Sequence, residues 1–290
     1  MTQIINNVKK LQKILKKNHK TIKFIPTLGN LHDGHKKLIR ESQKIPGVSV
    51  ASIFINPLQF DNKLDFLSYP KTFIRDSNII KNLNVDILFA PNKTFSNDTK
   101  SKNFDQYKNL IKVLCGKNRP GHFEGVIMIL RKFLKIIKPH YLILGEKDFQ
   151  QTLIVKKLIK NIKLNTQIKL IKTQRMQSGL AISSRNSMLS SIGKSNAANL
   201  FKIMNDIKHD IMNSGLLKNQ LDNYKNKLIS SGFEKVNYLE IRNENDLSEI
   251  KSKPFKSRVF ISANIENIKL IDNLYLGRIK VRGQYFCVSF

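Results

Sequence analysis

Up to Ile182, short apolar runs alternate with stretches of helical periodicity. Such runs predict buried strands, and strands separated by helices predict a parallel sheet with helices on both faces. We expect strands near 22–25, 48–55, 86–90, 141–144 and 168–173, and helices near 34–43, 73–82, 125–137 and 150–161. The ligand of such a sheet lies beyond the carboxyl ends of the strands. The sequence therefore predicts an α/β, Rossmann-like domain with its site at that edge.

The pattern changes after Ile182. Two helical stretches, Ser191–Met212 and Leu217–Ser231, precede shorter apolar runs near 237–241, 258–264 and 268–271. This succession favours a smaller α+β domain. We therefore expect a catalytic domain over residues 1–182 and a second domain over residues 183–290.

The N-terminal twenty residues predict an amphipathic helix. Its apolar side would carry Ile4, Ile5, Val8, Leu11 and Leu15. The segment lacks the apolar core and cleavage site of a secretory signal. Residues 126–144, the most apolar long stretch, contain four basic residues, so we expect no membrane span. The two cysteines give no disulfide framework, and we expect a reducing cytoplasm.

The formal net charge is +30, from 51 basic and 21 acidic residues. The lysines are spread along the chain rather than gathered in one arm, and Lys, Asn and Ile are plentiful throughout. We interpret the charge mainly as compositional drift; a true surface for polyanions is the alternative. In either case, the positive field attracts anions such as ATP.

The decapeptide PTLGNLHDGH, residues 26–35, follows the first internal strand and opens a helix. A strand, a glycine-containing turn and a helix N-terminus favour phosphate, because backbone N–H groups and the helix dipole both attract an anion. His32 and His35 add donors that a generic turn does not need. The alternative is an ordinary strand-to-helix turn.

Three more polar clusters follow predicted strands. Asn56 and Gln59 present amides that could bind a small polar substrate, although Asn56 could instead cap its own turn. The stretch 145–151, GEKDFQQ, offers Lys147 for phosphates and Glu146 or Asp148 for Mg²⁺ through water, and Asp148 could instead be only a helix N-cap. Gln151 could direct its amide towards the crevice.

The last of these clusters, residues 179–186, reads GLAISSRN. Two hydroxyls beside an arginine suit phosphate oxygens, although a polar turn between domains would look similar. Residues 114–123 predict a mobile loop whose Lys117, Arg119 and His122 could assist anions. We expect Asp61 and Asp76 to lie on the solvated surface.

Together these motifs resemble the pantothenate synthetase (pantoate–β-alanine ligase) family. The resemblance spans roughly residues 1–276 and includes the segments 26–35, 53–60, 69–72, 85–91, 114–126, 145–151, 179–186, 237–241 and 269–276. The HxGH motif at 32–35 also relates the chain to other nucleotidyl-transferring enzymes.

The resemblance implies an ATP-dependent, Mg²⁺-requiring ligation in two steps, through pantoyl adenylate. It assigns catalysis to His35, His32 and Lys147, and pantoate or β-alanine binding to Gln59, Gln151 and Asn56. It implies no certain metal ligand in the protein, since Mg²⁺ would be held mainly by the phosphates of ATP. The residues it implies for ATP are Leu28, Gly29, Asn30, Leu31, His32, Asp33, Gly34, His35, Gly145, Glu146, Lys147, Asp148, Gln174, Ile182, Ser183, Ser184 and Arg185.

The resemblance further implies a homodimer and a second domain that closes over the site. This chain departs from the family by Leu28 in place of Met and by Ser178 where an acidic residue is common. The tail 277–290 lies beyond the family pattern and could be an extra strand or a frayed end. Two rival functions stay open: a related enzyme that adenylates another acid, and a nucleic-acid-binding protein that uses the positive charge.

Overall fold

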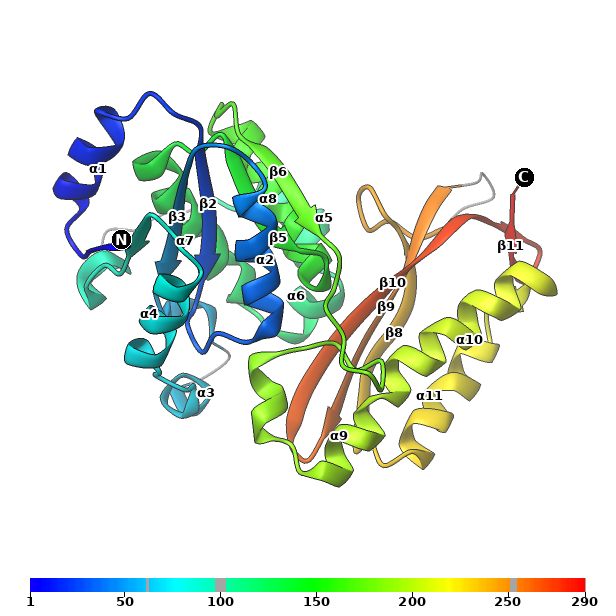
Figure 1. Cartoon of the computed structure of the whole chain (residues 1–290). Helices are drawn as coiled ribbons and strands as arrows, with labels where there is room; N and C mark the ends of the chain where they lie inside the picture. The colour runs from blue at the N-terminus through cyan, green and yellow to red at the C-terminus, as the bar shows by residue number, and fades with distance from the viewer. Residues whose placement is uncertain (61–62, 97–102, 251–254, 290) are drawn as a thin grey trace. The chain divides into compact units, whose positions relative to one another are not determined.

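The computed structural model describes residues 1–60, 63–96, 103–250 and 255–289. Internal contacts divide the chain into two units, residues 1–108 with 119–173, and residues 109–118 with 174–290 (Figure 1). Residues 174–182, which we expected in the first domain, group with the second unit. They do so because Arg175 binds Asp272 and stacks on Phe201, both of which belong to that unit.

The first unit contains a six-stranded sheet in the order β1-β4-β3-β2-β5-β6. Every neighbouring pair is parallel, as expected. Its strands are β1 (Gln3–Ile5), β2 (Ile22–Thr27), β3 (Val48–Ile53), β4 (Ile87–Phe89), β5 (Tyr141–Gly145) and β6 (Gln167–Ile171).

Helices surround this sheet in Figure 1. The helices of this unit are α1 (Val8–Lys16), α2 (Asp33–Gln43), α3 (Lys63–Ser68), α4 (Phe73–Asn82), α7 (His122–Ile137) and α8 (Phe149–Asn161), and the short α5 (Lys108–Ile111) leads from this unit into the second. Ile25 of β2 packs in one cluster with Ile39 of α2 and Ile80 of α4. The preceding Phe24 contacts Phe133 of α7, at 5.4 Å between ring centroids. Because successive strand residues point to opposite faces, α2 and α4 cover one face and α7 covers the other.

The expected N-terminal helix was wrong over its first residues. Residues 3–5 instead form β1, which extends the sheet beside β4 and buries Ile5. Asn7 then accepts a hydrogen bond from the Lys10 N–H at 3.0 Å and starts α1 at Val8.

The direction of the strand order reverses between β2 and β5. From β2 the chain continues outwards through β3 and β4, whereas β5 is followed on the other side by β6. The crevice for a ligand in an open parallel sheet lies at such a reversal. The histidine turn follows β2 and the segment 145–148 follows β5, so both border this crevice.

The second unit is an antiparallel sheet in the order β7-β11-β10-β9-β8, packed against helices, which confirms the α+β expectation. Its elements are α6 (Leu114–Asn118), α9 (Ser191–Ala197), α10 (Asn199–Asn213), β7 (Leu216–Leu217), α11 (Gln220–Ser230), β8 (Lys235–Asn243), β9 (Phe255–Ile265), β10 (Ile268–Arg282) and β11 (Tyr285–Val288).

Three sequence expectations need correction in this unit. The stretch 191–212 is two helices that meet at Ala198 rather than one. Residues 114–118, expected in a loop, form the helix α6. The strand expected at 268–271 continues to Arg282 and turns back into β11, so the tail contributes an extra strand rather than a frayed end.

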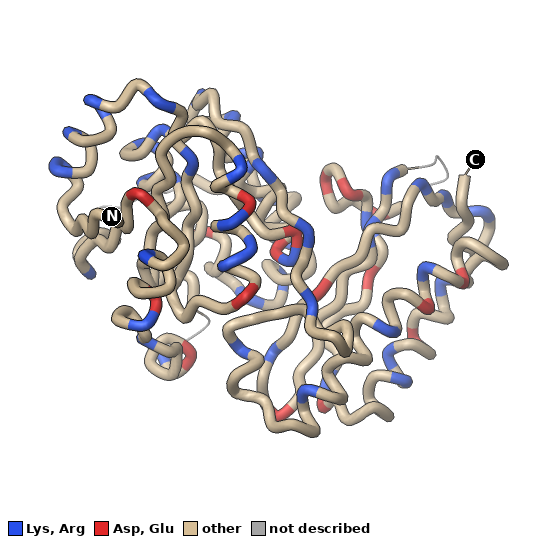
Figure 2. The backbone as a smooth tube through the Cα atoms, in the orientation of Figure 1, with Lys and Arg blue, Asp and Glu red and all other residues tan. Residues whose placement is uncertain are grey.

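Lys and Arg residues are distributed along both units rather than on one element (Figure 2). None of the helices in the described ranges is long and apolar enough to cross a membrane.

Candidate active site

The turn between β2 and α2 places two histidines at the start of a helix. Gly29 (φ 84°) and Asn30 (φ 48°) both adopt left-handed conformations, which reverse the chain after the strand. His32 is the N-cap residue of α2, and its backbone N–H donates to Nδ1 of His35 at 3.4 Å. The two imidazole rings lie 4.0 Å apart between centroids. Because Nδ1 of His35 accepts a hydrogen bond, the neutral ring carries its proton on Nε2.

Both histidines are neutral at pH 7. Burial is the main cause that lowers the pKa of His32 to about 2, and the positive charge that His35 carries when protonated, together with that of Lys147, lowers it further. Burial also lowers the pKa of His35 to about 4, with Lys147 acting in the same direction and Asp148 and Asp76 opposing it. The His32 side chain faces the backbone N–H of His35 in a capping box, and its buried Nδ1 makes no hydrogen bond of ordinary geometry within the described residues.

The backbone N–H groups of this turn are used by the protein itself. Gly29 N–H donates to the Thr27 hydroxyl at 3.2 Å, and the N–H groups of Asn30 and Leu31 donate to the Asp76 carboxylate at 2.7 and 2.9 Å. The expectation of a solvated Asp76 was therefore wrong, because α4 packs this side chain beneath the turn, with 0% of the residue exposed. Asp61 lies outside the described residues.

A second segment borders the crevice after β5. Glu146–Asp148 form a 3₁₀ turn that leads into α8, with Asp148 at the N-cap position but without a side-chain cap hydrogen bond. The charge of Lys147 acts on both histidines, and that of Asp148 acts on His35. The structure thus brings the two predicted clusters, 26–35 and 145–148, into one electrostatic environment. Gln151 lies half-buried in the first turn of α8.

Asn56 and Gln59 follow β3 and form a connected pair. Asn56 is fully buried, and its Oδ1 accepts the Leu58 N–H at 3.3 Å, so the capping alternative is confirmed. Its Nδ2 donates to the Gly125 carbonyl at 3.0 Å and to Oε1 of Gln59 at 3.3 Å. The amide oxygen of Gln59 is thereby engaged, and the Nε2 end carries the donors for a ligand.

Arg119 and His122, which we expected to assist anions, make hydrogen bonds within the protein. Nδ1 of His122 donates to the Gln59 carbonyl at 2.5 Å, and an Arg119 nitrogen lies 3.2 Å from Nε2 of His122. Arg119 also donates to the same carbonyl at 3.4 Å. These two side chains therefore hold the backbone of Gln59 in place.

In the second unit, the loop from Gln174 to Arg185 is closed by its own backbone. The Ile182 N–H donates to the Gln174 carbonyl at 2.9 Å. Arg175 donates to Asp272 at 2.5 and 3.0 Å and to the Gly179 carbonyl at 3.1 Å. The loop is thus anchored to its own unit by an arginine that sequence analysis did not single out.

The predicted phosphate ligands of this unit follow directly. Ser183 caps the 3₁₀ turn 184–188 by accepting the Arg185 N–H at 3.3 Å. The Arg185 side chain donates to the Lys269 carbonyl at 3.4 Å. The turn therefore gathers Ser183, Ser184 and Arg185 in one short segment.

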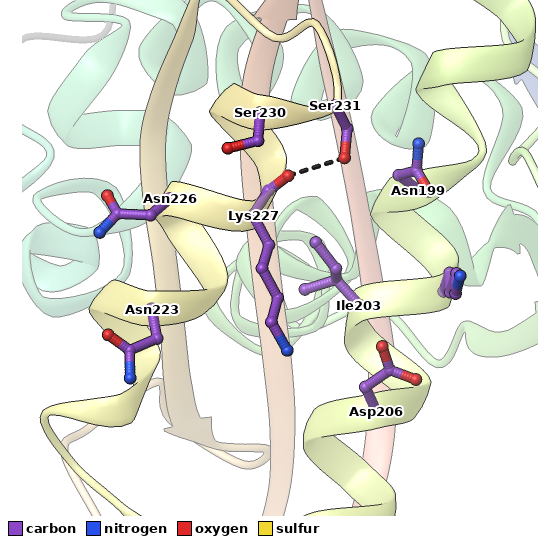
Figure 3. A pocket seen from close by; sticks show the side chains of 9 residues that line it. Asn199, Ile203, Asp206, Asn223, Asn226, Lys227, Ser230 and Ser231 are labelled. Atoms are coloured by element: carbon purple, nitrogen blue, oxygen red, sulfur yellow. Dashed lines mark hydrogen bonds between the residues drawn. The ribbon is translucent and has the colours of Figure 1, made fainter.

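A polar pocket of about 550 Å³ lies between α10 and α11 of the second unit (Figure 3). None of the predicted site residues lines it. Its lining residues are Asn199, Lys202, Ile203, Asp206, Asn223, Asn226, Lys227, Ser230 and Ser231.

Comparison with known proteins supports the same interpretation. A family model described as pantoate-beta-alanine ligase matches residues 3–275. A pantothenate synthetase of Buchnera aphidicola subsp. Acyrthosiphon pisum (strain Tuc7) is 41% identical over 277 residues, covering 93% of this chain and 97% of the relative. A pantothenate synthetase of Shewanella woodyi (strain ATCC 51908 / MS32) is 37% identical over 279 residues, covering 96% of this chain and 99% of the relative.

Two solved structures share the fold. The pantoate-beta-alanine ligase of Francisella tularensis, complexed with beta-gamma ATP and beta-alanine, has a TM-score of 0.80 at 33% identity, with 95% of this chain and 98% of that chain covered. The pantothenate synthetase of Thermus thermophilus has a TM-score of 0.86 at 27% identity, with 96% and 100% covered.

A parallel sheet with paired histidines and a lysine at its switch point is typical of a nucleotide-binding α/β enzyme. The family match extends over nearly the whole chain. The chain belongs to the pantoate-beta-alanine ligase family. The resemblance inferred from the sequence is therefore confirmed: the chain is a ligase, and its reaction is the ATP-dependent condensation of pantoate with β-alanine.

Proposed function

We propose that the chain performs this condensation in two half-reactions at the switch point of the first unit. The pantoate carboxylate attacks the α-phosphorus of ATP, which forms pantoyl adenylate and releases pyrophosphate. The β-alanine amine then attacks the acyl carbon, loses a proton, and displaces AMP to give pantothenate. The observation that carries this proposal is the pair of neutral histidines beside Lys147 at the carboxyl ends of β2 and β5.

His32 and His35 act as neutral hydrogen-bond donors to the α-phosphate rather than as charged acids. The Nε2–H of His35 is oriented by the bond that its Nδ1 accepts from the His32 backbone. Such donors stabilise the charge that develops on the phosphate oxygens in the transition state. The negative charge on the phosphate oxygens strengthens these hydrogen bonds from the neutral rings.

The backbone of residues 28–31 contributes the shape of this ATP site rather than hydrogen-bond donors. Its N–H groups at Gly29, Asn30 and Leu31 are engaged with Thr27 and Asp76. The imidazoles, together with the N-terminal end of α2 around Asp33 and Gly34, then provide the interactions with the triphosphate.

Lys147 holds the phosphates as a point charge, next to Gly145, Glu146 and Asp148 in the turn after β5. Mg²⁺ is supplied with ATP, as part of the substrate. We assign the ligands of Mg²⁺ mainly to the phosphates of ATP, and Glu146 or Asp148 could contribute through water.

Gln59 and Gln151 bind pantoate. Asn56 holds the side-chain oxygen of Gln59, and His122 holds its backbone carbonyl. These two bonds direct the Nε2 donors of Gln59. Asn56 itself acts as a positioning residue, because its side chain is buried and its hydrogen bonds are made within the protein.

From the sequence we also assign ATP contacts to Gln174, Ile182, Ser183, Ser184 and Arg185 in the second unit, which the resemblance expects to close over the site.

We also propose that the chain forms a homodimer and acts in the cytoplasm. The dimer is supported by the exposed apolar side chains of α3 and α4, namely Leu64, Leu67 and Ile74. Sedimentation equilibrium at micromolar concentration tests the dimer, and a monomer mass would contradict it.

The reaction itself is tested by measuring the two half-reactions separately. We expect pyrophosphate from Mg-ATP and D-pantoate alone, and AMP only after β-alanine is added. Pyrophosphate with another acid but not with pantoate would retain the adenylation chemistry and reject the substrate. No pyrophosphate with any acid would reject the proposal.

A further inference from the structure

The carboxylate of Asp76 sits inside the turn that carries the histidines. Oδ2 accepts the Asn30 N–H at 2.7 Å and the Thr72 hydroxyl at 2.9 Å, while Oδ1 accepts the Leu31 N–H at 2.9 Å. The Arg75 guanidinium lies 3.3 Å from Oδ1. A fully buried carboxylate tolerates burial because its oxygens accept this set of hydrogen bonds.

The turn has the shape of an anion-binding site, and the protein's own Asp76 carboxylate occupies it. Consecutive N–H groups in turn conformations form a concavity that binds anions. The concavity at Asn30 and Leu31 holds the Asp76 carboxylate. A Cβ on Gly29 would lie 3.1 Å from Oδ2 of Asp76, so glycine permits this approach as well as the φ of 84°.

The Arg75 side chain also stabilises this turn through hydrogen bonds. Its Nη2 donates to Oδ1 of Asn30 at 2.8 Å and to the Leu31 carbonyl at 3.3 Å. Asn30 is thereby held at a positive φ that a non-glycine residue adopts only at an energetic cost. Side chains from α4 thus fix both residues that directly precede the first histidine.

We propose that Asp76 is a positioning residue for the reaction, which holds the turn 29–31 so that His32 and His35 face the α-phosphate. This inference rests on the proposed function of the same turn. The charge of Asp76 also raises the pKa of His35, against the larger effect of burial. Loss of Asp76 therefore changes the histidines in both position and electrostatics.

The test is Asp76→Asn, which keeps the size but replaces one oxygen with an N–H donor. That donor must face an N–H group of either Asn30 or Leu31, so one of the two bonds becomes repulsive. The matched control is Asp86→Asn. Asp86 also accepts a backbone N–H and a hydroxyl, both from Ser49, at 2.8 and 2.6 Å, but it does so between β3 and β4, away from the turn.

The first readout is the tautomer of His35 by ¹⁵N NMR of the imidazole nitrogens, without any substrate. We expect one neutral tautomer, protonated on Nε2, in the wild type and in Asp86→Asn, and a mixture in Asp76→Asn. An unchanged tautomer in Asp76→Asn would overturn the proposal, whatever the activity of the enzyme.

The second readout is pantoate-dependent pyrophosphate formation. A displacement of about 1 Å in a reacting group costs about 100-fold in rate, and we expect a fall of this size in kcat, with the KM of pantoate within about threefold. A kcat like that of Asp86→Asn would overturn the positioning role. An inactive wild type would instead reject the proposed function, and the tautomer measurement would still decide the role of Asp76.

Circular dichroism and thermal melting show whether Asp76→Asn is folded at the assay temperature. If it is not, Thr72→Val makes a smaller change of the same kind, because it removes the hydroxyl bond to Asp76 and a longer one from Arg75 but leaves the carboxylate and both backbone bonds in place. We then expect a partial tautomer mixture and a partial loss of kcat, and wild-type values for both would overturn the proposal.

Discussion

At the β2–α2 turn, the side chain of His35 is both uncharged at neutral pH and fixed in orientation. His35 is uncharged, and the orientation of its N–H is set by a backbone donor rather than by a carboxylate. Lys147 supplies positive charge that acts on both histidines. In the proposed mechanism, adenylation is divided between an oriented neutral donor and a cation.

We predict that His35→Ala and Lys147→Ala each lower kcat for pyrophosphate formation by about 100- to 1,000-fold, since each removes an interaction with the transition state. The matched control is Lys156→Ala, on an exposed position of α8, for which we expect activity within about twofold. Steady-state kinetics and circular dichroism provide the measurement. Near-normal turnover in both site variants would contradict the assignment.

The lowered histidine pKa values predict how stability depends on pH. In the unfolded chain a histidine has a pKa near 6.5, whereas His35 has a pKa of about 4 in the folded state. Between these values the unfolded state binds more protons, so the free energy of unfolding decreases as the pH falls from about 6.5 to about 4. We expect this loss to be on the order of 3 kcal/mol for His35.

Urea unfolding between these pH limits measures the effect. Because His35→Gln cannot bind the proton, its stability should change less steeply with pH than that of the wild type. His209→Gln, at an exposed position of α10, is the control and should keep the wild-type slope. Equal slopes in all three proteins would contradict the prediction.

At the scale of elements, the contact between α7 and the 3₁₀ turn 57–59 determines where Gln59 lies. The two backbones approach so closely that a Cβ on Gly125 would lie 2.2 Å from the Leu58 carbonyl oxygen. Only a glycine fits there, and the same approach allows Asn56 to reach the Gly125 carbonyl.

We therefore predict that Gly125→Ala lowers the free energy of unfolding by about 2 kcal/mol or more, because two backbones must separate. It should also raise the KM of pantoate by displacing Gln59. Gly277→Ala is the control, since its φ of 92° is strained but its Cβ would meet nothing within 4 Å, and we expect a cost of about 1 kcal/mol. Urea unfolding and steady-state kinetics test both effects, and equal costs would contradict the explanation.

His122 is predicted to act on the same element from its other side. Removing its bond to the Gln59 carbonyl in His122→Ala should raise the KM of pantoate by about tenfold, the value of a hydrogen bond of about 1 kcal/mol or slightly more. The KM of ATP should change little. A rise in the KM of ATP alone would indicate that His122 binds the nucleotide, as the sequence first suggested.

The parallel sheet could be predicted from the sequence because its central strands are nearly continuous apolar runs, buried on both faces. The short run at Ile4 and Ile5 fitted a helix equally well, and only pairing with β4 made it a strand. Asp76 illustrates what local patterns miss. An aspartate in the first turn of a helix is usually solvated, and its burial here depends on a turn more than forty residues earlier.

The site could be predicted in part for the same reason. Motifs that follow strands of one parallel sheet must meet at one edge, so the proximity of 26–35 and 145–148 was predictable. The roles of His122 and Arg175 were not, because a hydrogen bond to a distant carbonyl or carboxylate leaves no periodic signal in the sequence.

At the scale of the whole molecule, the net charge of +30 acts on every anionic substrate. Raising the ionic strength from about 0.01 M to about 0.15 M shortens the Debye length from about 30 Å to about 8 Å. We predict that the KM of ATP rises over this range and that the thermal midpoint also rises, because repulsion within the folded chain is screened. A matched series in sucrose is the control, and a KM of ATP that does not change with salt would contradict the prediction.

The carboxylate of Asp76 holds the turn 29–31 in its conformation independently of any nucleotide. Where a phosphate-binding loop is shaped by the phosphate, its ordering entropy is lost at the moment of binding. Here the Asp76 carboxylate keeps the backbone N–H groups of Asn30 and Leu31 in place from the time the chain folds. At the proposed site we therefore expect ATP to meet a preorganised turn, with no loss of affinity to the cost of building that turn.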